Sequence, residues 1–304
     1  MPGGCEIGAR PIDMHIDALG AMGVETEQKQ GRILCRTAGL KGAEINLAYP
    51  SVGATENIML AAVLAKGVTV IRNAAREPEI VCLAELLKRM GASVHGAGTR
   101  VIYIKGVKRL HGAEFTCIPD RIEAGTYLCA AAAAGGKIAL KGVVMNHLES
   151  LTQILEGIGG EIRRKGDVLE FTALRRMKAF SFATAPYPGF PTDMQSQMCA
   201  LACVCRGESR VRETVFENRM HHLEMLARAG AQIARSGETV LIRGCRKLKP
   251  MDYTAHDLRG GAAYLIAALA AEGRSTVRGT HFIDRGYEDP EGKLMAMGAD
   301  IIRV

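Results

Sequence analysis

The sequence predicts an α/β protein that is built from repeated β-α-β-α-β-β units and divided into two domains. A short motif of helix, glycine and strand recurs at Gly23, Gly91, Gly159, Gly230 and Gly298, with separations of 68, 68, 71 and 68 residues. Such a steady period indicates that one supersecondary unit recurs along the chain. The chain of 304 residues, 48% of them hydrophobic, is also long enough to bury two ordinary cores.

Each motif ends an amphipathic helix with a glycine and continues as a β-branched strand. Glycine suits this position because it adopts the left-handed conformation that ends many helices. In the unit that begins near Leu40, apolar spacing predicts alternating strands and helices. The expected elements are an extended segment at 43–47, a helix at 55–65, a strand at 68–72, a helix at 80–90, and strands at 93–94 and 101–105. Units at 110–177 and 177–248 repeat that order, and the last unit runs from Leu248 to the C-terminus.

The chain opens in the middle of a repeat. Before Leu40 it has only a helix, Gly23 and a strand, which correspond to the second half of a unit. The period therefore predicts that the first half of this unit is missing and that Met1 marks an internal or misassigned start.

The formal net charge of +7 and the pI near 9 favour anionic partners, which could be nucleic acid, a membrane surface or a multiply anionic metabolite. Charge alone does not choose among them. Basic and acidic residues alternate, as in Arg76–Glu79, so a nucleic-acid tail is disfavoured. The N-terminus has no basic region followed by an apolar one, and no apolar run reaches about 18 residues. We expect a soluble, cytoplasmic protein that binds small anionic molecules, with neither nucleic acid nor membrane as a partner.

The nine cysteines predict neither a disulfide framework nor a metal site. There is no C-x-x-C motif, and Cys199, Cys203 and Cys205 lie in an apolar helical stretch, as reduced core cysteines do. The histidines at 15, 221 and 222 do not form a metal-binding set. We therefore expect no metal.

Seven ordered segments resemble the motifs of the enolpyruvyl transferases that act on UDP-N-acetylglucosamine, and the similarity runs from Pro2 to Val304. They are Pro2–His15, Ser51–Asn57, Asn73–Glu79, Pro119–Glu123, Phe190–Gln195, Thr214–Arg219 and Ile283–Tyr287. The resemblance implies an inside-out α/β barrel fold, with two domains that each contain three β-α-β-α-β-β units. It assigns residues 1–118 to a truncated first domain and 119–304 to the second. Four and a half of six units are present, so on the order of 110 residues are expected to precede Met1.

The resemblance also implies a reaction. The enolpyruvyl group of phosphoenolpyruvate passes to the 3-hydroxyl of UDP-N-acetylglucosamine and phosphate is released, as the first committed step of peptidoglycan precursor synthesis. No cofactor and no obligate protein partner are implied. In this assignment Cys5 is the acid and adduct-forming nucleophile, Asp193 is the general base, and Arg10 and Arg285 bind phosphoenolpyruvate.

The resemblance assigns the nucleotide sugar to a larger set of residues. These are Arg10, Pro11, Ile12, Asp13, Met14, Tyr49, Pro50, Ser51, Val52, Asp193 and Val215, with Tyr49 and Pro50 at positions where relatives vary. Asp257, Arg259 and Arg219 are expected to support the site.

Simpler interpretations are open for several of these residues. Cys5 has glycines on both sides, which would let a loop close over substrate, and arginines nearby that can stabilise a thiolate, but it could equally be an idle thiol. Asp193 follows a Pro-Thr turn before an apolar helix, where a plain N-cap aspartate also occurs. The Ser51 turn precedes a helix whose N–H groups can bind phosphate, as many such turns do. For Asp257 and Arg259, active-site electrostatics and ordinary capping or ion pairing are equally compatible with the sequence.

Three other functions compete with this assignment. A shikimate-branch enolpyruvyl transferase would share the fold, but the Cys5 loop argues against it. A catalytically incomplete fragment, or a remnant that only binds nucleotide sugar, is favoured by the absence of the family's phosphate-binding lysine segment. A nucleic-acid-binding module ranks third.

Overall fold

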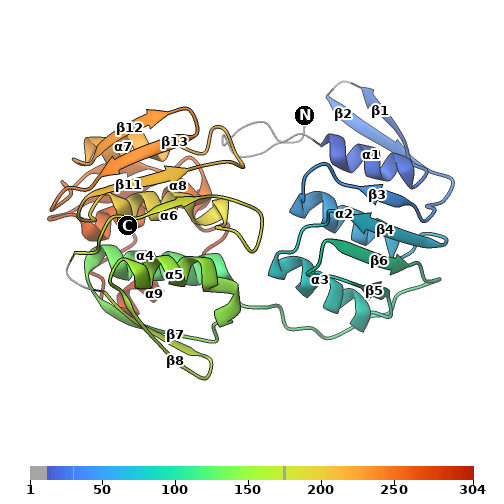
Figure 1. Ribbon diagram of the computed structural model, residues 1–304, viewed down its shortest axis with the longest axis horizontal. Helices are drawn as coiled ribbons and strands as arrows, with labels where there is room; N and C mark the ends of the chain where they lie inside the picture. The colour runs from blue at the N-terminus through green and yellow to red at the C-terminus, as the bar shows by residue number, and fades with distance from the viewer. Residues whose placement is uncertain (1–11, 30, 174–175) are drawn as a thin grey trace. The chain divides into compact units, whose positions relative to one another are not determined.

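The structure is a computed structural model that describes residues 12–29, 31–173 and 176–304 (Figure 1). The chain divides into two compact units. The described residues up to Ile118 form the first unit together with Pro186–Pro188, and Pro119–Ala185 with Gly189–Val304 form the second. Each unit buries a large hydrophobic cluster of its own.

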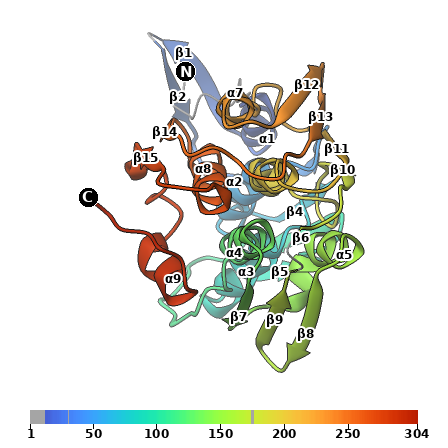
Figure 2. The ribbon, with the colours of Figure 1, turned by 90° about the vertical axis from the view of Figure 1, so that its left-hand side faces the viewer.

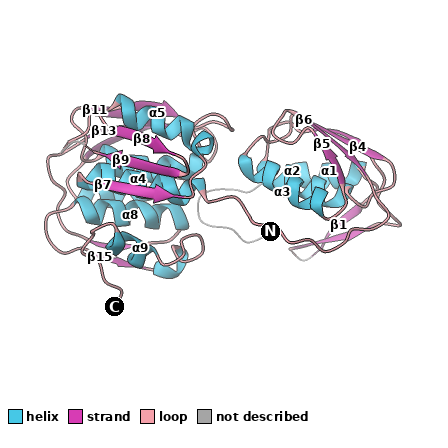
Figure 3. Cartoon of the chain, turned by 90° about the horizontal axis from the view of Figure 1, so that it is seen from below, coloured by secondary structure: helices cyan, strands magenta, loops and turns pink. Residues whose placement is uncertain are grey.

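The first unit contains a hairpin and a four-stranded sheet, with three helices on one side of the strands (Figure 3). In the sheet, whose order is β3-β4-β6-β5, only the β3–β4 pair is parallel. Its elements are α1 (Asp13–Ala21), β1 (Glu25–Lys29), β2 (Arg32–Arg36), β3 (Glu44–Asn46), α2 (Val52–Ala62), β4 (Val68–Arg72), α3 (Pro78–Arg89), β5 (Ser93–His95) and β6 (Val101–Lys105).

The predicted order of the unit near Leu40 is confirmed, and two of its strands have the expected bounds. Both helices begin earlier than their apolar spacing predicts, for local reasons. Ser51 caps α2 by accepting a hydrogen bond from the Ala54 N–H at 3.3 Å. Pro78 occupies the first position of α3, where its fixed φ and missing N–H are tolerated.

The second unit surrounds three central helices with three sheets, whose orders are β7-β9-β8, β10-β11-β13-β12 and β14-β15. In Figure 2 these sheets lie on different sides of α4 and α8. The elements are α4 (Arg121–Ala134), β7 (Lys137–Lys141), η1 (Met145–Leu148), α5 (Glu149–Gly157), β8 (Glu161–Lys165), β9 (Val168–Thr172), β10 (Ser181–Ala183), η2 (Thr192–Met194), α6 (Gln195–Ala202), β11 (Glu208–Arg212), α7 (His222–Arg228), β12 (Gln232–Ser236), β13 (Thr239–Arg243), β14 (Asp252–Thr254), α8 (Leu258–Ala270), β15 (Thr276–Arg278), η3 (Thr280–Phe282) and α9 (Pro290–Ala296).

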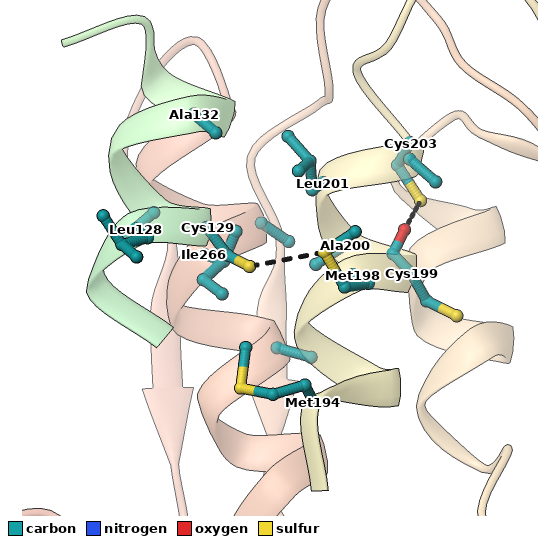
Figure 4. Close-up of a cluster of buried hydrophobic side chains, with 14 of the residues drawn as sticks. Leu128, Cys129, Ala132, Met194, Met198, Cys199, Ala200, Leu201, Cys203 and Ile266 are labelled. Carbon is teal, nitrogen blue, oxygen red and sulfur yellow. Dashed lines mark hydrogen bonds between the residues drawn. The ribbon is translucent and has the colours of Figure 1, made fainter. Parts of the chain in front are cut away.

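Helices α4, α6 and α8 pack against one another (Figure 4). Every residue of α6 is buried. A glycine of α4 also allows the close approach of α5 and of η2. An added Cβ at Gly125 of α4 would lie 2.9 Å from Leu151 Cδ2 and from Met194 Cε. The thiol of Cys129 lies 3.6 Å from the sulfur of Met198, and burial raises the pKa of Cys129, Cys199 and Cys203. Cys199, Cys203 and Cys205 are free and buried, as the sequence predicts, and Cys129 is a further free cysteine of the same core.

The five repeated glycines all have the predicted left-handed conformation, with φ between 91° and 116°. At each one the glycine N–H and the next N–H bond to carbonyls of the preceding helix, as for Gly91 to Lys88 at 2.9 Å and Ala92 to Leu87 at 2.9 Å. The recurring motif is therefore a helix end that turns the chain into the next segment.

Two expected strands are absent from the described residues. The unit at 110–177 has no strand before α4, because 110–118 belongs to the first unit whereas α4 and β7 belong to the second. After Gly298, residues 299–304 do not form the expected strand. In the other repeats this strand pairs with the strand that follows it, and here Ile301 packs against the core without strand pairing.

Alanine at two glycines should have opposite effects on stability. Gly230 has φ +116° and open space around an added Cβ, so Gly230→Ala should cost about 1 kcal/mol through backbone strain alone. Gly157 is the last residue of α5 and also has open space, so Gly157→Ala should stabilise by roughly 0.5–1 kcal/mol. Urea unfolding measures both changes, and shifts of the same sign would contradict the helix-end assignment.

Candidate active site

Asp193 lies in η2, at the entry to the buried helix α6, and forms ion pairs with two arginines. Its Oδ1 is 2.8 Å from Arg219 Nη1, and its Oδ2 is 2.9 Å from Arg259 Nη2. The arginine side chains are 7% and 12% exposed, whereas that of Asp193 is 39% exposed. The carboxylate is therefore accessible in front of two nearly buried cations.

These arginines lower the pKa of the Asp193 carboxyl group. Burial alone would raise the pKa of Asp193, but the positive charges of Arg219 and Arg259 and their hydrogen bonds outweigh it and lower the pKa to about 2. No side-chain cap is formed by Asp193 on either η2 or α6. The N-cap interpretation is thus wrong, and Asp193 is held as a paired carboxylate.

Arg259 also connects this pair to a buried polar network. Its Nη1 donates to the hydroxyl of Tyr287 at 3.4 Å, and this hydroxyl lies 2.8 Å from Thr126 Oγ1. The amide of Gln197 donates to both hydroxyls, at 3.1 Å for Thr126 and 3.4 Å for Tyr287. Asp257 caps α8 by accepting from the N–H groups of Arg259 and Gly260. Capping therefore accounts for Asp257, and Arg259 provides the ion pair.

Arg219 comes from the loop that follows β11. Its guanidinium stacks 5.0 Å from the ring centroid of Phe216 and donates to Thr192 Oγ1 at 2.8 Å. The same loop contains Val215, which is half-buried and whose N–H donates at 2.8 Å to Glu213. The structure therefore places Val215 on the loop that supplies one of the arginines on Asp193.

In the first unit, the structure brings together the two segments predicted to bind nucleotide. Ile12, Asp13 and Met14 lie at the start of α1, and Tyr49–Val52 leads into α2. The starts of these helices meet, because His15 Nδ1 lies 2.6 Å from Asn57 Nδ2 and a Cβ at Gly53 would lie 3.4 Å from His15 Cε1. Sequence spacing gives no sign of this contact, since the two residues are 42 positions apart.

Other predicted residues are less informative. Cys5, Arg10 and Pro11 lie outside the described residues. Arg285 is exposed in the turn after η3, two positions before the buried Tyr287.

The second unit also contains a cavity of about 330 Å³, which lies apart from Asp193. The start of α4, the end of β7 and α9 line it, with Tyr127, Lys141 and Lys293 among the lining residues. Glu123 accepts hydrogen bonds here from Tyr127 at 2.9 Å and from Lys293 at 2.7 Å. None of the predicted catalytic or substrate-binding residues lines the cavity. We assign the site to Asp193, where charged side chains converge on an accessible carboxylate.

Within residues 12–29, 31–173 and 176–304, no group of three or more His, Cys, Asp or Glu side chains is arranged to hold a metal ion. Across the same part of the chain, none of the helices combines the length and apolar character needed to cross a membrane.

His222 lies at the start of α7 and is buried, with 3% exposure. Burial lowers its pKa to about 4, with Asp257 opposing the shift and Arg219 adding to it. Because the usual value is 6.5, the unfolded chain binds more protons between these values. The stability provided by the neutral ring is therefore complete above about pH 6.5 and is lost as the pH falls towards 4.

Urea unfolding should show that the wild type loses about 2 kcal/mol through this residue between about pH 7 and pH 5. His222→Leu should lose correspondingly less over that range, whereas the exposed neighbour variant His221→Leu should behave like the wild type. An unchanged pH dependence in His222→Leu would contradict the buried neutral ring.

Comparison with known proteins identifies the family. The chain matches the family model for EPSP synthase (3-phosphoshikimate 1-carboxyvinyltransferase) over residues 1–294. It is 50% identical, over its whole length and 73% of the relative, to UDP-N-acetylglucosamine 1-carboxyvinyltransferase 2 of Caldanaerobacter subterraneus subsp. tengcongensis. It is 47% identical to UDP-N-acetylglucosamine 1-carboxyvinyltransferase of Trichlorobacter lovleyi, again over 73% of that protein.

Solved structures agree with the sequence relatives. The enolpyruvyl transferase NikO from Streptomyces tendae superposes with a TM-score of 0.86 and 26% identity, over 96% of this chain and 72% of that one. EPSP synthase from Acinetobacter baumannii, at 19% identity and a TM-score of 0.69, shares the fold over 100% of this chain and 74% of its own. These likenesses confirm the predicted inside-out α/β fold class. On both the sequence matches and the fold, the chain belongs to the enolpyruvyl transferase (carboxyvinyltransferase) family.

Proposed function

We propose that this chain transfers the enolpyruvyl group of phosphoenolpyruvate to the 3-hydroxyl of UDP-N-acetylglucosamine and releases phosphate. The observation that supports this most is the accessible carboxylate of Asp193 on two nearly buried arginines. The identity of 50% to a protein named for this activity supports the choice of acceptor.

The proposed reaction requires one base and one acid. The sugar oxygen forms a bond to C2 of phosphoenolpyruvate while its proton leaves and the methylene carbon C3 gains a proton. The C2–O bond to phosphate then breaks and C3 returns a proton, which restores the double bond. Asp193 accepts the hydrogen bond of the sugar hydroxyl in this scheme, and Cys5 delivers the proton to C3. The resulting Cys5 thiolate can add to C2 as the adduct, and this S–C2 bond breaks again when the sugar oxygen bonds to C2, which returns the thiolate that takes the proton back from C3.

The low pKa of Asp193 constrains its role. A carboxylate with a pKa of about 2 is ionised near neutral pH but is a weak base. We infer that it orients the hydroxyl first and becomes more basic when the anionic substrate draws Arg219 or Arg259 away. Asp257 supports this arrangement by capping the helix that begins with Leu258 and carries Arg259.

The anionic groups of the substrates require cations and free N–H groups. Arg10 and Arg285 bind phosphoenolpyruvate in this proposal, since a guanidinium fork pairs with carboxylate or phosphate through two parallel hydrogen bonds. The nucleotide contacts Arg10–Met14 and Tyr49–Val52, where the contact between α1 and α2 supports a common binding surface. Val215 contacts the sugar.

The proposal extends to the organisation and role of the protein. Residues 1–118 and 119–304 are the first and second enolpyruvyl transferase domains in this proposal, which is supported by the change of compact unit between Ile118 and Pro119. The protein acts in the cytoplasm on small molecules, without a cofactor, a metal or an obligate protein partner. Its product enters peptidoglycan precursor synthesis, and through it cell shape and division.

Transfer to 3-phosphoshikimate is the second candidate, because the matching family model carries that name. The identity of 19% to EPSP synthase, against 50% to the UDP-N-acetylglucosamine enzyme, argues for the nucleotide sugar. Supplying each acceptor separately with phosphoenolpyruvate distinguishes the two.

Phosphate release should occur with UDP-N-acetylglucosamine and not with 3-phosphoshikimate. Asp193→Asn and Cys5→Ser should each lower kcat at least roughly 100-fold, because each removes a proton-transfer group. Asp252→Asn, at an exposed position on β14, is the matched control and should retain wild-type rates.

The outcomes separate the candidates. Nucleotide-sugar binding in calorimetry without phosphate release would favour a binding remnant or an incomplete fragment. Adding the front of the Caldanaerobacter relative to the chain then tests the fragment interpretation. Phosphate release that persists in Asp193→Asn would overturn the role given to this residue.

A further inference from the structure

We propose that Glu213 is a positioning residue, which holds both Asp193 and the backbone of Val215 in the geometry that receives the sugar. The inference rests on the proposed function, because it concerns the same site. Glu213 does not touch the reacting atoms in this proposal. It acts through Thr192 and Arg219.

Glu213 is a buried acid directly after β11, with 2% exposure, and it accepts four hydrogen bonds. Its Oε1 accepts from Thr184 Oγ1 at 2.9 Å, from the Val215 N–H at 2.8 Å and from the Phe216 N–H at 3.2 Å. Its Oε2 accepts from Thr192 Oγ1 at 2.9 Å. One side chain therefore joins two separate segments, the turn before α6 and the loop after β11.

The bond to Thr192 leads directly to Asp193. A threonine hydroxyl has one proton and two lone pairs, so a proton donated to Glu213 leaves a lone pair for a second donor. Arg219 Nη1 donates to this oxygen at 2.8 Å and also lies 2.8 Å from Asp193 Oδ1. The acceptor character of Glu213 thus orients the Thr192 hydroxyl, and the hydroxyl fixes the guanidinium that pairs with Asp193.

The bonds of Oε1 hold the loop that contains Val215. Thr184, at the end of β10, accepts from the Thr214 N–H at 2.8 Å, and the Thr214 hydroxyl donates to the Thr184 carbonyl at 2.6 Å. The backbone of residues 214–216 is therefore held by hydrogen bonds to Thr184 and to the Glu213 carboxylate. Any buried carboxylate needs hydrogen-bond donors, but the donors of Glu213 include the residue before Asp193 and the backbone N–H of Val215, so its bonds tie together two parts of the candidate site.

Two substitutions separate positioning from simple structural support. Glu213→Gln keeps the size of the side chain and an oxygen for the Thr184, Val215 and Phe216 donors. Its amide nitrogen, however, cannot accept the proton of the Thr192 hydroxyl. It can only donate to that hydroxyl, which already accepts an N–H from Arg219. Thr192→Val keeps the shape and removes the bridge while Glu213 stays intact. The matched control is Glu238→Gln, which changes an exposed acid at the neighbouring turn.

Steady-state kinetics with UDP-N-acetylglucosamine and phosphoenolpyruvate is the first readout, with Tm measured beside it. Glu213→Gln and Thr192→Val should each lower kcat roughly tenfold. The double variant should be no worse than about the same tenfold, because both changes break one path. KM for phosphoenolpyruvate should stay within about twofold. Glu238→Gln should match the wild type.

Carboxyl-detected NMR titration of Asp193 is the second readout and needs no turnover. A displaced Arg219 should raise the titration midpoint by roughly half a pH unit in Glu213→Gln and in Thr192→Val. Thr192→Val decides the matter if Glu213→Gln does not fold.

Wild-type rates and an unchanged midpoint in folded variants would overturn the inference, as would losses that multiply to about a hundredfold in the double variant. A wild-type chain without turnover would sink the proposed function instead, and the titration would still test the positioning of Asp193.

Discussion

The charge pair of Asp193 with Arg219 and Arg259 is the interaction on which the second unit and its site depend. Two guanidinium groups that are 7% and 12% exposed are costly to bury without a counter-charge. Asp193 supplies that charge to both. Asp193 lies in η2, Arg219 in the loop after β11, and Arg259 in the first turn of α8. The ion pairs therefore connect three segments that are far apart in the sequence.

This pair also explains how a well-packed core can carry an accessible acid. Helices α4, α6 and α8 pack against one another, and Thr126, Gln197 and Tyr287 share hydrogen bonds in this core, although Gln197 Oε1 has no partner among the described residues. Arg259 extends that network to Asp193 at the entry of α6. The Asp193 carboxylate is therefore held by two arginines, and one of them is itself hydrogen-bonded to the core.

Elements of the fold that depend on neighbouring residues could be predicted from the sequence, whereas those that depend on distant residues could not. The glycine helix ends and the strands at 68–72 and 101–105 could be predicted because their causes lie within a few residues. The missing strands before α4 and after Gly298 could not, because a strand needs a partner whose position the local sequence does not contain.

For the candidate site, the sequence could indicate which residues take part but could not show how they contact one another. The resemblance supplied Asp193, Arg219 and Arg259, but their contacts join residues up to 66 positions apart and required the fold. Glu213 was missed although a signal existed. Ser209 and Val211 are the buried positions of β11, so the alternation places an acid at the next inward position. A buried acid that follows an alternating strand therefore merits a search for its donors.

The most direct test of this account is a crystal structure of the chain with UDP-N-acetylglucosamine bound. We predict that the 3-hydroxyl of the sugar lies at hydrogen-bond distance from the Asp193 carboxylate, roughly 2.6–3.2 Å, beside the backbone of Val215. A nucleotide sugar in the cavity near Tyr127 and Lys141, with Asp193 still bound only to its two arginines, would contradict the account.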